Sequence, residues 1–379
     1  MLKIDKLKNC CGCSACASIC SHNAISMEPD ILGFKYPQID TEKCVDCGLC
    51  ERVCSFKSDY NISSNLDEPD AYGVRHKDIN EVMLSRSGGA FCALVEYVFK
   101  NGGVVYGAGY DENFRVYHKR ATTKEESVGL RGSKYVQSDV SSTFEQVKLD
   151  LKSGLIVLFS GTACQVAGLK SYIGDRLQDK LILVDIVCHG VPSPKLWQDY
   201  LAYIKQKYKT NILKANFRDK SDIGWKGHKE TFVLERTGKI TMSSWTHLFY
   251  KNIMLRPSCG NCHFCNLKRP ADITLGDFWG SEKQNPEANS DNKGLSLVLV
   301  NTPKGQKVFN EIKKDISYFS TTPDIYMQHN LHSPSVLSPE SEKFKEDYSK
   351  YGFEYIVKKY SDSKFKKVIK MIKRKLHIK

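Results

Sequence analysis

The sequence predicts an α/β (α+β) body with a mixed sheet, preceded by a small cysteine-rich domain. Two observations support this fold class. Nine of the fifteen cysteines fall in two short runs before residue 55. Beyond residue 70, apolar strand-like segments alternate with amphipathic helix-like segments, which is typical of a sheet covered by helices. We expect the small domain over 1–60, a polar linker over 61–70, the body over 71–340 and a basic C-terminal tail over 341–379.

Composition predicts a cytoplasmic protein. The chain of 379 residues is 41% hydrophobic and 26% charged, as in ordinary globular proteins. It has no run of eighteen apolar residues, and its basic N-terminus leads into cysteines instead of an apolar signal segment. In a reducing compartment, fifteen cysteines indicate metal binding or redox chemistry more than a disulfide framework.

The net charge of +13 is concentrated at the C-terminus. Residues 358–379 contain ten Lys or Arg and one acid, Asp362, which leaves only +4 for the rest of the chain. A nearly neutral body without basic, aromatic-rich patches excludes a nucleic-acid-binding class. Apolar residues recur in the tail at helical spacing, so it could lie peripherally on the inner face of a membrane or contact a partner protein. A solvated helix packed on the body is the alternative.

Two cysteine runs near the N-terminus share one spacing. CCGCSACASIC and CVDCGLCERVC both contain C-x2-C-x2-C-x3-C, as in the two halves of a dicluster ferredoxin. Three cysteines of each run can wrap one 4Fe–4S cube, while the fourth ligates the other cube. Zinc fits these crowded runs poorly. The predicted ligand sets are Cys10, Cys13, Cys16 and Cys54 for one cluster, and Cys44, Cys47, Cys50 and Cys20 for the other. Cys11 is left over as a packed thiol.

Apolar runs and amphipathic periods place the elements of the body. We expect strands at 104–110, 155–161, 181–188, 212–218, 230–236, 272–278 and 295–301. We expect helices at about 89–101, 163–173, 195–208 and 304–315. The first buried strands are separated by helices, which favours a largely parallel or mixed sheet.

Three glycine–hydroxyl turns lie where helices or turns begin. They are SRSGGA (85–90), RGSKYV (131–136) and SGTACQ (160–165). Free backbone N–H groups at such positions can bind a phosphate, although a single turn of this kind is more often only a helix cap. Together they suggest a phosphate-bearing redox cofactor. No GxGxxG follows a strand, so a dinucleotide-binding Rossmann fingerprint is not predicted.

A third cysteine motif, CGNCHFC (259–265), lacks a fourth local thiol. Cys188 ends a buried strand at the edge where sites are built, and it is the predicted fourth ligand of a third 4Fe–4S cluster. His189 and His263 are the alternatives, and four-thiolate zinc is the alternative metal. Cys92 and Cys164 are interpreted as packed thiols. Asp277 and Trp279 should lie close to this site.

These motifs, in this order, resemble a known family. RSGG, GSKYVQS, SGTACQVAGLK, DIVCHGVPS and CGNCHFCNLKRPADITLGDFWG follow a dicluster ferredoxin, as in coenzyme F420 hydrogenase/dehydrogenase β subunits of the bacterial type. The resemblance implies a non-covalent FAD and a 4Fe–4S cluster in the body, held by Cys188, Cys259, Cys262 and Cys265. The residues implied to line the flavin are Ser87, Gly88, Gly132, Ser133, Lys134, Tyr135, Gly161, Thr162 and Gln165.

The resemblance implies an iron–sulfur flavin-dependent oxidoreductase. A ferredoxin or flavodoxin would supply electrons, the clusters would relay them, and FAD would pass them to an organic acceptor. Related bacterial proteins often occur beside surface-polysaccharide genes, which suggests an acceptor in that metabolism. Lys134 is the catalytic candidate near the flavin, with an ordinary solvated lysine as the alternative. The competing hypothesis is an electron-transfer subunit that serves a separate catalytic protein. The segment CHGVPSP differs from the archaeal, F420-using members, so the sequence does not predict F420 as the acceptor.

Overall fold

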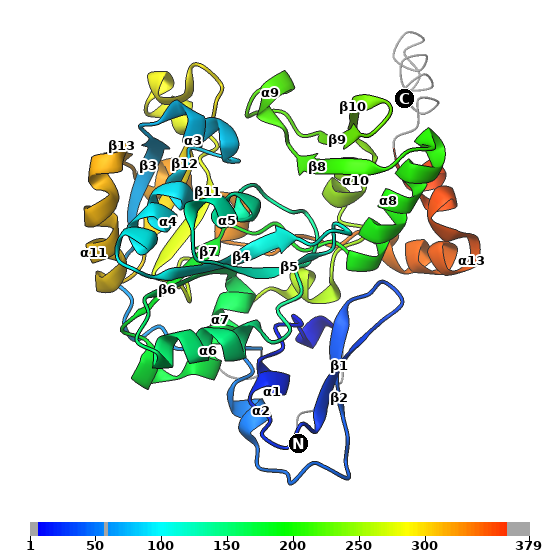
Figure 1. The fold of residues 1–379 in the computed structure, drawn as a ribbon, viewed down its shortest axis with the longest axis horizontal. Coiled ribbons are helices and arrows are strands. Elements are labelled where there is room, and N and C mark those ends of the chain that lie inside the picture. Colours follow the sequence, from blue (N-terminus) through cyan, green and yellow to red (C-terminus); the bar gives the residue numbers. More distant parts are fainter. Residues whose placement is uncertain (1–6, 57–59, 362–379) are drawn as a thin grey trace.

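The body is built on one mixed sheet of eight strands in the order β13-β3-β12-β11-β7-β6-β4-β5. The computed structural model describes residues 7–56 and 60–361 (Figure 1). Four neighbouring strands, β4, β6, β7 and β11, are parallel, and antiparallel strands extend the sheet on both sides. The strands are β3 (Asp70–His76), β4 (Val104–Tyr110), β5 (Val116–Ala121), β6 (Val157–Thr162), β7 (Leu181–Ile186), β11 (Ile273–Asp277), β12 (Ser296–Val300) and β13 (Ile316–Ser320).

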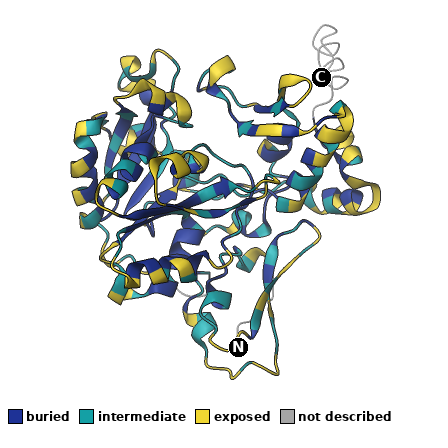
Figure 2. Ribbon diagram, viewed as in Figure 1, coloured by how far each residue is buried: buried dark blue, intermediate teal, exposed yellow. Residues whose placement is uncertain are grey.

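Helices cover both faces of this sheet, as expected for buried parallel strands. On one face, α4 (Ala90–Lys100) and α11 (Pro303–Ile312) pack apolar residues against the strands. On the other face, α6 (Thr143–Lys152) and α7 (Ala163–Ile173) do the same. The central strands are therefore buried on both sides, while the outer helix faces are exposed (Figure 2). Shorter helices, α3 (Ile79–Leu84), α5 (Lys124–Ser127) and α12 (Pro323–Tyr326), lie in the connections.

The N-terminal domain lies beneath α6 and α7 (Figure 1). It contains α1 (Ala15–Ser18), α2 (Leu49–Arg52) and a hairpin of β1 (Ile25–Pro29) with β2 (Lys35–Ile39). Ala15 and Val53 join the apolar cluster formed by α6, α7 and the sheet. This domain therefore packs directly on the body, and the segment after it stays close: Leu66 N donates to Asn301 O at 2.7 Å.

A second, three-stranded sheet stands beside the main one. Its strands are β8 (Ile212–Phe217), β9 (Glu230–Leu234) and β10 (Gly238–Met242), with the short α9 (Lys220–Ile223) between β8 and β9. α8 (Pro194–Tyr208), α10 (Ser244–Tyr250) and α13 (Ser341–Tyr360) pack around it in one apolar cluster. In Figure 1 this unit faces α3 across the top of the main sheet.

Residues 341–360, which the sequence assigned to the basic tail, form helix α13 and pack against α8. Phe344 and Ile356 on this helix are fully buried. The expected amphipathic segment beyond Ser361 lies outside the described residues. Across the described part of the chain, no helix is both long and apolar enough to span a bilayer.

The expected mixed α/β architecture is confirmed. All seven expected body strands and four expected helices are present within a few residues of their predicted bounds. The predicted helix at 304–315 ends as a helix at Ile312 and continues as a 3-10 turn, Lys313–Asp315. The sequence analysis missed β3, β5, β10, β13 and α6.

Candidate functional site

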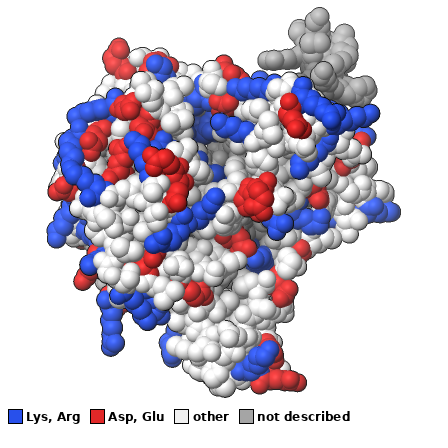
Figure 3. All heavy atoms as spheres, in the orientation of Figure 1, with Lys and Arg blue, Asp and Glu red and all other residues white. Residues whose placement is uncertain are grey.

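A cavity of about 790 Å³ opens at the carboxyl ends of the parallel strands. Its floor is formed by residues from the ends of β6, β7 and β11. Its walls come from the loops after β7 and β11 and from the segments around residues 85–91, 130–136, 249–250 and 324–330. This is the edge at which open α/β sheets bind ligands. The space-filling view shows a hollow between the lobe of α3 and the lobe of β8–β10, with Lys and Arg side chains along it (Figure 3).

The cavity brings together the residues predicted to line a flavin. All of them border it except Gly88: Ser87, Gly132, Ser133, Lys134, Tyr135, Gly161, Thr162 and Gln165. Thr162 is the N-cap of α7 as predicted, and Gln165 Oε1 accepts from its backbone N–H at 3.1 Å. Gly88 is buried behind the wall, where an added Cβ would lie 2.3 Å from Val74 O. Its role is close packing of the turn against β3.

A buried guanidinium with free donors faces this cavity. Arg86 lines it, and Arg86 Nη2 donates to Asn216 Oδ1 at 2.8 Å. Among the described residues, the Nε and Nη1 groups of Arg86 are buried without a hydrogen-bond partner. Unsatisfied buried donors are costly, so this position suits an anionic group such as a phosphate. The residues present thus fit the phosphate-bearing end of a cofactor.

Lys134 adds a second cation to the same wall. Its Nζ donates to the carbonyl oxygens of Gly129 at 2.8 Å and Arg131 at 2.9 Å. Burial, and then the charges of Arg86 and Lys119, lower the pKa of Lys134 to about 7. Lys134 therefore changes charge near neutral pH, and a bound anion would favour its charged form.

One wall of the cavity carries a rigid aromatic and ionic group. Arg218 is 3% exposed, pairs with Asp277, and has a left-handed backbone φ of 55°. Trp225 donates its indole N–H to Asp277 Oδ1 at 2.8 Å and stacks on Trp279 with a centroid distance of 4.1 Å. A non-glycine residue in this backbone region costs free energy and often marks a functional position. His228 also lines this wall; burial, then Arg218, lowers its pKa to about 4, so its imidazole is neutral at pH 7.

The body cysteines lie together under one corner of the large cavity. A smaller cavity of about 40 Å³ is lined by the four predicted ligands and by two further thiols: Cys188, Cys259, Cys262, Cys265, Cys11 and Cys164. Residues 188–191 and Thr162 border both cavities. Burial and the neighbouring thiols raise the pKa of Cys188. Such thiols ionise readily only when a metal centre compensates the charge, which fits an iron–sulfur cluster.

Two loops bring Cys188 and Cys259 together by running antiparallel. Arg256 N donates to Val191 O at 3.0 Å, and Pro192 forms an isolated β-bridge with Leu255. The Val191 N–H in turn points at Cys259 Sγ, at 3.4 Å. Gly190 has a φ of 139°, and a Cβ there would lie 2.8 Å from Leu255 Cδ1. Only glycine allows the two loops to approach this closely.

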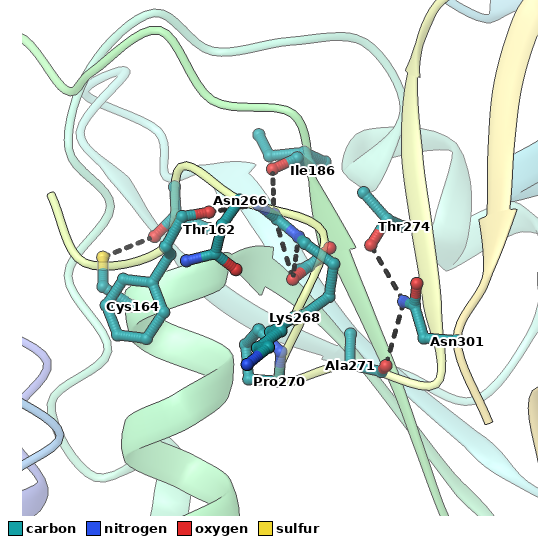
Figure 4. Close-up of polar contacts among 12 residues, drawn as sticks. Thr162, Cys164, Ile186, Asn266, Lys268, Pro270, Ala271, Thr274 and Asn301 are labelled. Carbon is teal, nitrogen blue, oxygen red and sulfur yellow. Dashed lines mark hydrogen bonds and ion pairs between the residues drawn. The ribbon is translucent and has the colours of Figure 1, made fainter. Parts of the chain in front are cut away.

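A buried ion pair fixes the loop after Cys265. Arg269 is 1% exposed and Asp185 is 0% exposed, and their charged groups lie 3.0 Å apart. Arg269 Nη2 also donates to Ile186 O at 3.0 Å, next to the cysteine loop. In Figure 4, the segment of Asn266 and Lys268 passes beside Thr162 and Cys164 at the start of α7. This pair therefore ties the third cysteine motif to the end of β7.

The two histidine alternatives occupy other positions. His263 is exposed and stacks on Phe56 at a centroid distance of 4.5 Å. His189 lines the cavity, but its Nε2 lies 2.6 Å from Asn252 Oδ1 and its Nδ1 lies near Ser335. Within residues 7–56 and 60–361, no three His, Cys, Asp or Glu side chains are arranged to hold a single metal ion.

The N-terminal cysteines separate into the two predicted sets. Cys20, Cys44, Cys47 and Cys50 line one cavity of about 20 Å³. Cys16 lies within electrostatic reach of the other three members of its set, Cys10, Cys13 and Cys54. In each group, three cysteines of one run lie near the fourth cysteine of the other run, and the ligand sets themselves stay a prediction.

Cys11 and Cys164 connect the first N-terminal set to the body set. The thiol of Cys11 lies within interaction distance of those of Cys13 and Cys164, and Cys11 and Cys164 line the small cavity together with Cys188 and Cys259. Helix α7 makes this contact possible because Gly168 faces Cys13: a Cβ at Gly168 would lie 2.7 Å from Cys13 Sγ. The first N-terminal set, the body set and the large cavity thus form one continuous series.

Comparison with known proteins agrees with this arrangement. Residues 155–324 match the family described as the C terminus of the coenzyme F420 hydrogenase/dehydrogenase beta subunit, and residues 9–58 match the 4Fe-4S dicluster domain. The chain therefore carries a 4Fe-4S dicluster domain and is related, over residues 155–324, to this β-subunit family. No curated protein matched. A chain from a structure titled "Xenon derivatization of the F420-reducing [NiFe] hydrogenase complex from Methanosarcina barkeri" is 19% identical, with a TM-score of 0.47. The match covers 77% of this β-subunit-like chain and 90% of that chain.

Several site residues escaped the sequence analysis. Arg86 adjoins the SRSGGA turn, but a single arginine gives no local signal. Arg218, His228 and His118 lie outside every motif, and only the tertiary fold brings them to the cavity. The clearest available signal was CCGC, in which Cys11 interrupts the cluster spacing; the structure places this thiol between two cysteine sets.

Proposed function

We propose that this chain is an iron–sulfur flavoprotein oxidoreductase. It would take electrons from a ferredoxin- or flavodoxin-type donor through two N-terminal 4Fe–4S clusters and a third in the body. The acceptor would be an organic molecule at the large cavity. The observation that carries the proposal is the continuous series from the N-terminal cysteines, through Cys11 and Cys164, to a cavity bordered by Cys188.

The chain's own residues supply binding and placement. Arg86 and Lys134 would hold the phosphates of FAD, together with the turns that contain Gly132 and Thr162. FAD, when bound, supplies the exchange between one-electron carriers and a two-electron acceptor. Cys188 would complete the ligand set of Cys259, Cys262 and Cys265. Thr162 and the 188–191 loop border both cavities, so they would contact both the site of the cluster and the site of the flavin.

The cavity favours an enzyme over a pure electron carrier. Its walls present Trp279, His228 and Arg218, which suit recognition of an organic molecule, and Tyr250 beside them is 44% exposed. A carrier would need little beyond the dicluster domain. We place the acceptor in surface-polysaccharide metabolism and the protein in the cytoplasm. The match of residues 155–324 to a family of β subunits suggests that partner proteins serve as donors.

Anaerobic purification with iron, sulfide and flavin quantification tests the proposal. Three 4Fe–4S clusters predict about twelve irons and twelve sulfides, and one FAD, per chain. Cys188→Ser should lower iron to about eight and leave the N-terminal clusters in place. About eight irons in the wild type would refute the body cluster, and absence of flavin would refute the flavoprotein assignment.

Two matched variants separate ligands from bystanders. Cys164→Ser removes a thiol from the same cavity, and it should keep about twelve irons because Cys164 is not in the proposed set. Cys92→Ser changes a thiol that is 1% exposed inside α4 and distant from this cavity's lining. If Cys164→Ser loses iron while Cys188→Ser keeps about twelve irons, the fourth ligand of the body cluster is Cys164 and not Cys188.

A further inference from the structure

One buried arginine connects the N-terminal domain to the body at the cysteine sites. Arg256 is 1% exposed, and its Nε donates to Cys10 O at 2.8 Å. Its Nη2 donates to Lys35 O at 2.8 Å and lies 3.6 Å from Cys10 Sγ. Its Nη1 donates to Gln137 Oε1 at 3.0 Å. Residues from three distant segments thus surround a single guanidinium.

The backbone around this group leaves space for it. Gly12 has a φ of 69°, and a Cβ there would lie 2.7 Å from Arg256 Nη1. Tyr36 covers the other side, with its ring centroid 4.3 Å from the guanidinium carbon. Gln137 also donates to Cys11 O at 2.9 Å, which holds the CCGC turn against the body.

The charge of Arg256 has no carboxylate partner within the described residues. Each of the other two fully buried arginines at the site has one: Arg218 pairs with Asp277, and Arg269 pairs with Asp185. Arg256 instead meets three neutral oxygens and a cysteine sulfur. Buried charges are normally paired, so an anion should compensate this one.

Cysteine sets lie on both sides of Arg256. It contacts Cys10 of the first N-terminal set, and it lines the small cavity together with Cys188 and Cys259 of the body set. It does not line the cavity of Cys20, Cys44, Cys47 and Cys50. A 4Fe–4S cube with four thiolates carries roughly −2 when oxidised and one more negative charge when reduced.

We propose that Arg256 is the shared counter-ion of the first N-terminal cluster and the body cluster, and that it raises the reduction potential of both. This inference rests on the proposed function for the body cluster and on the dicluster domain for the first. When one electron enters either cluster, its charge becomes more negative, and the nearby cation stabilises the reduced form. A unit charge within ~10 Å, at an effective dielectric constant of about 20, shifts such an equilibrium roughly tenfold.

Redox titration of the purified holoprotein, followed by EPR and with dithionite as reductant, tests this role. In Arg256→Gln, the ratio of reduced to oxidised cluster at a fixed potential should fall about tenfold for these two clusters, equal to ~59 mV for one electron. The remaining cluster, held by Cys20 and its set, should keep its potential and serves as an internal control. Arg256→Lys, which keeps the charge without the forked hydrogen bonds, should shift less.

A second variant covers the case in which Arg256→Gln does not assemble its clusters. Gln137→Glu keeps the side-chain shape, places a carboxylate on Arg256 Nη1, and removes the amide donor to Cys11 O; it should lower the same two potentials. Arg115→Gln is the control: it removes a cation whose side chain is 69% exposed, and it should leave the reduction potentials of all three clusters unchanged. The proposal would be overturned if the variants with full iron content kept unchanged reduction potentials. It would also be overturned if the reduction potentials of all three clusters fell equally.

Iron content separates this inference from the proposed function. If the wild type holds about eight irons, the body cluster is absent and that half of the inference fails with it. In that case, the change in reduction potential of the cluster at Cys10 still tests Arg256, because this cluster belongs to the dicluster domain.

Discussion

Gly168 determines how closely helix α7 can approach the dicluster domain. The residue lies in the interior of α7, and its ideal Cβ position is 2.7 Å from Cys13 Sγ and 3.0 Å from Cys13 Cβ. As a proposed cluster ligand, Cys13 cannot rotate away. In an open helix position, replacing Gly by Ala would stabilise the protein by about 1 kcal/mol. Overpacking at this contact should cost about 1–3 kcal/mol.

The two effects predict that Gly168→Ala is neutral to about 2 kcal/mol less stable than the wild type. Gly168→Val should be worse, because its branched side chain adds atoms at the same contact. Gly129→Ala is the matched control, since Gly129 is exposed and nothing lies within 4 Å of its added Cβ. It should leave stability unchanged or raise it slightly.

The assay is anaerobic thermal unfolding of the iron-loaded protein, combined with the rate at which a chelator removes iron. Displacement of the dicluster domain should lower the unfolding temperature and speed iron release in the Gly168 variants alone. A Gly168→Ala protein that gains stability and retains iron as well as the wild type would refute the tight contact between α7 and Cys13.

Three further predictions concern charged groups. His118 is 5% exposed, and burial lowers its pKa to about 4. Between pH 6.5 and 4, His118 is protonated in the unfolded state and neutral in the folded state. The free energy of unfolding should therefore fall by up to about 3 kcal/mol as the pH drops from 6.5 to 4. Urea unfolding should show a smaller loss in His118→Gln; an equal loss would contradict this assignment. The pKa of free Lys134 is about 7, and a bound phosphate should raise it, so flavin affinity should fall above pH 7, by at most about tenfold per pH unit. Fluorescence titration should show this slope disappear in Lys134→Met. Asp185→Asn leaves Arg269 buried without its counter-charge and should cost about 3–5 kcal/mol in urea unfolding, with loss of body-cluster iron. Full stability would show that the pair is dispensable.

Sequence patterns were sufficient to locate the buried centre of the fold. The parallel strands β6 and β7 are continuous apolar runs, and hydrophobic periodicity detects these directly. Three of the missed strands, β5, β10 and β13, lie at sheet edges, whereas β3 is internal and pairs with both β12 and β13. β10 (GKITM) has no fully buried residue, and β5 (VYHKRA) is rich in polar side chains, so neither shows a strong apolar run. Their pairing depends on tertiary contacts.

The sequence predicted those site residues that lie in motifs beside strand ends. It did not predict the residues that reach the site from distant segments of the chain. The turns at Ser87, Gly132 and Gly161 carry local signals and do meet at one cavity. Arg218 and Arg256 carry none, because an isolated arginine looks the same whether it is buried or solvated. Cys164 was interpreted as a packed thiol, but it lies among the body cysteines.

The antiparallel contact between the 188–191 and 256–259 loops has a consequence for biogenesis. The dicluster ligands are all translated by residue 54, whereas the body set requires the chain through Cys265 and the closure of a long loop between Cys188 and Cys259. The two clusters of the dicluster domain can therefore be inserted early, whereas the proposed third cluster would require that β7 and β11 have paired. Under iron limitation, the expected intermediate is a protein with a loaded N-terminal domain and an empty body, which can accept electrons but has no cluster from which to deliver them to the cavity.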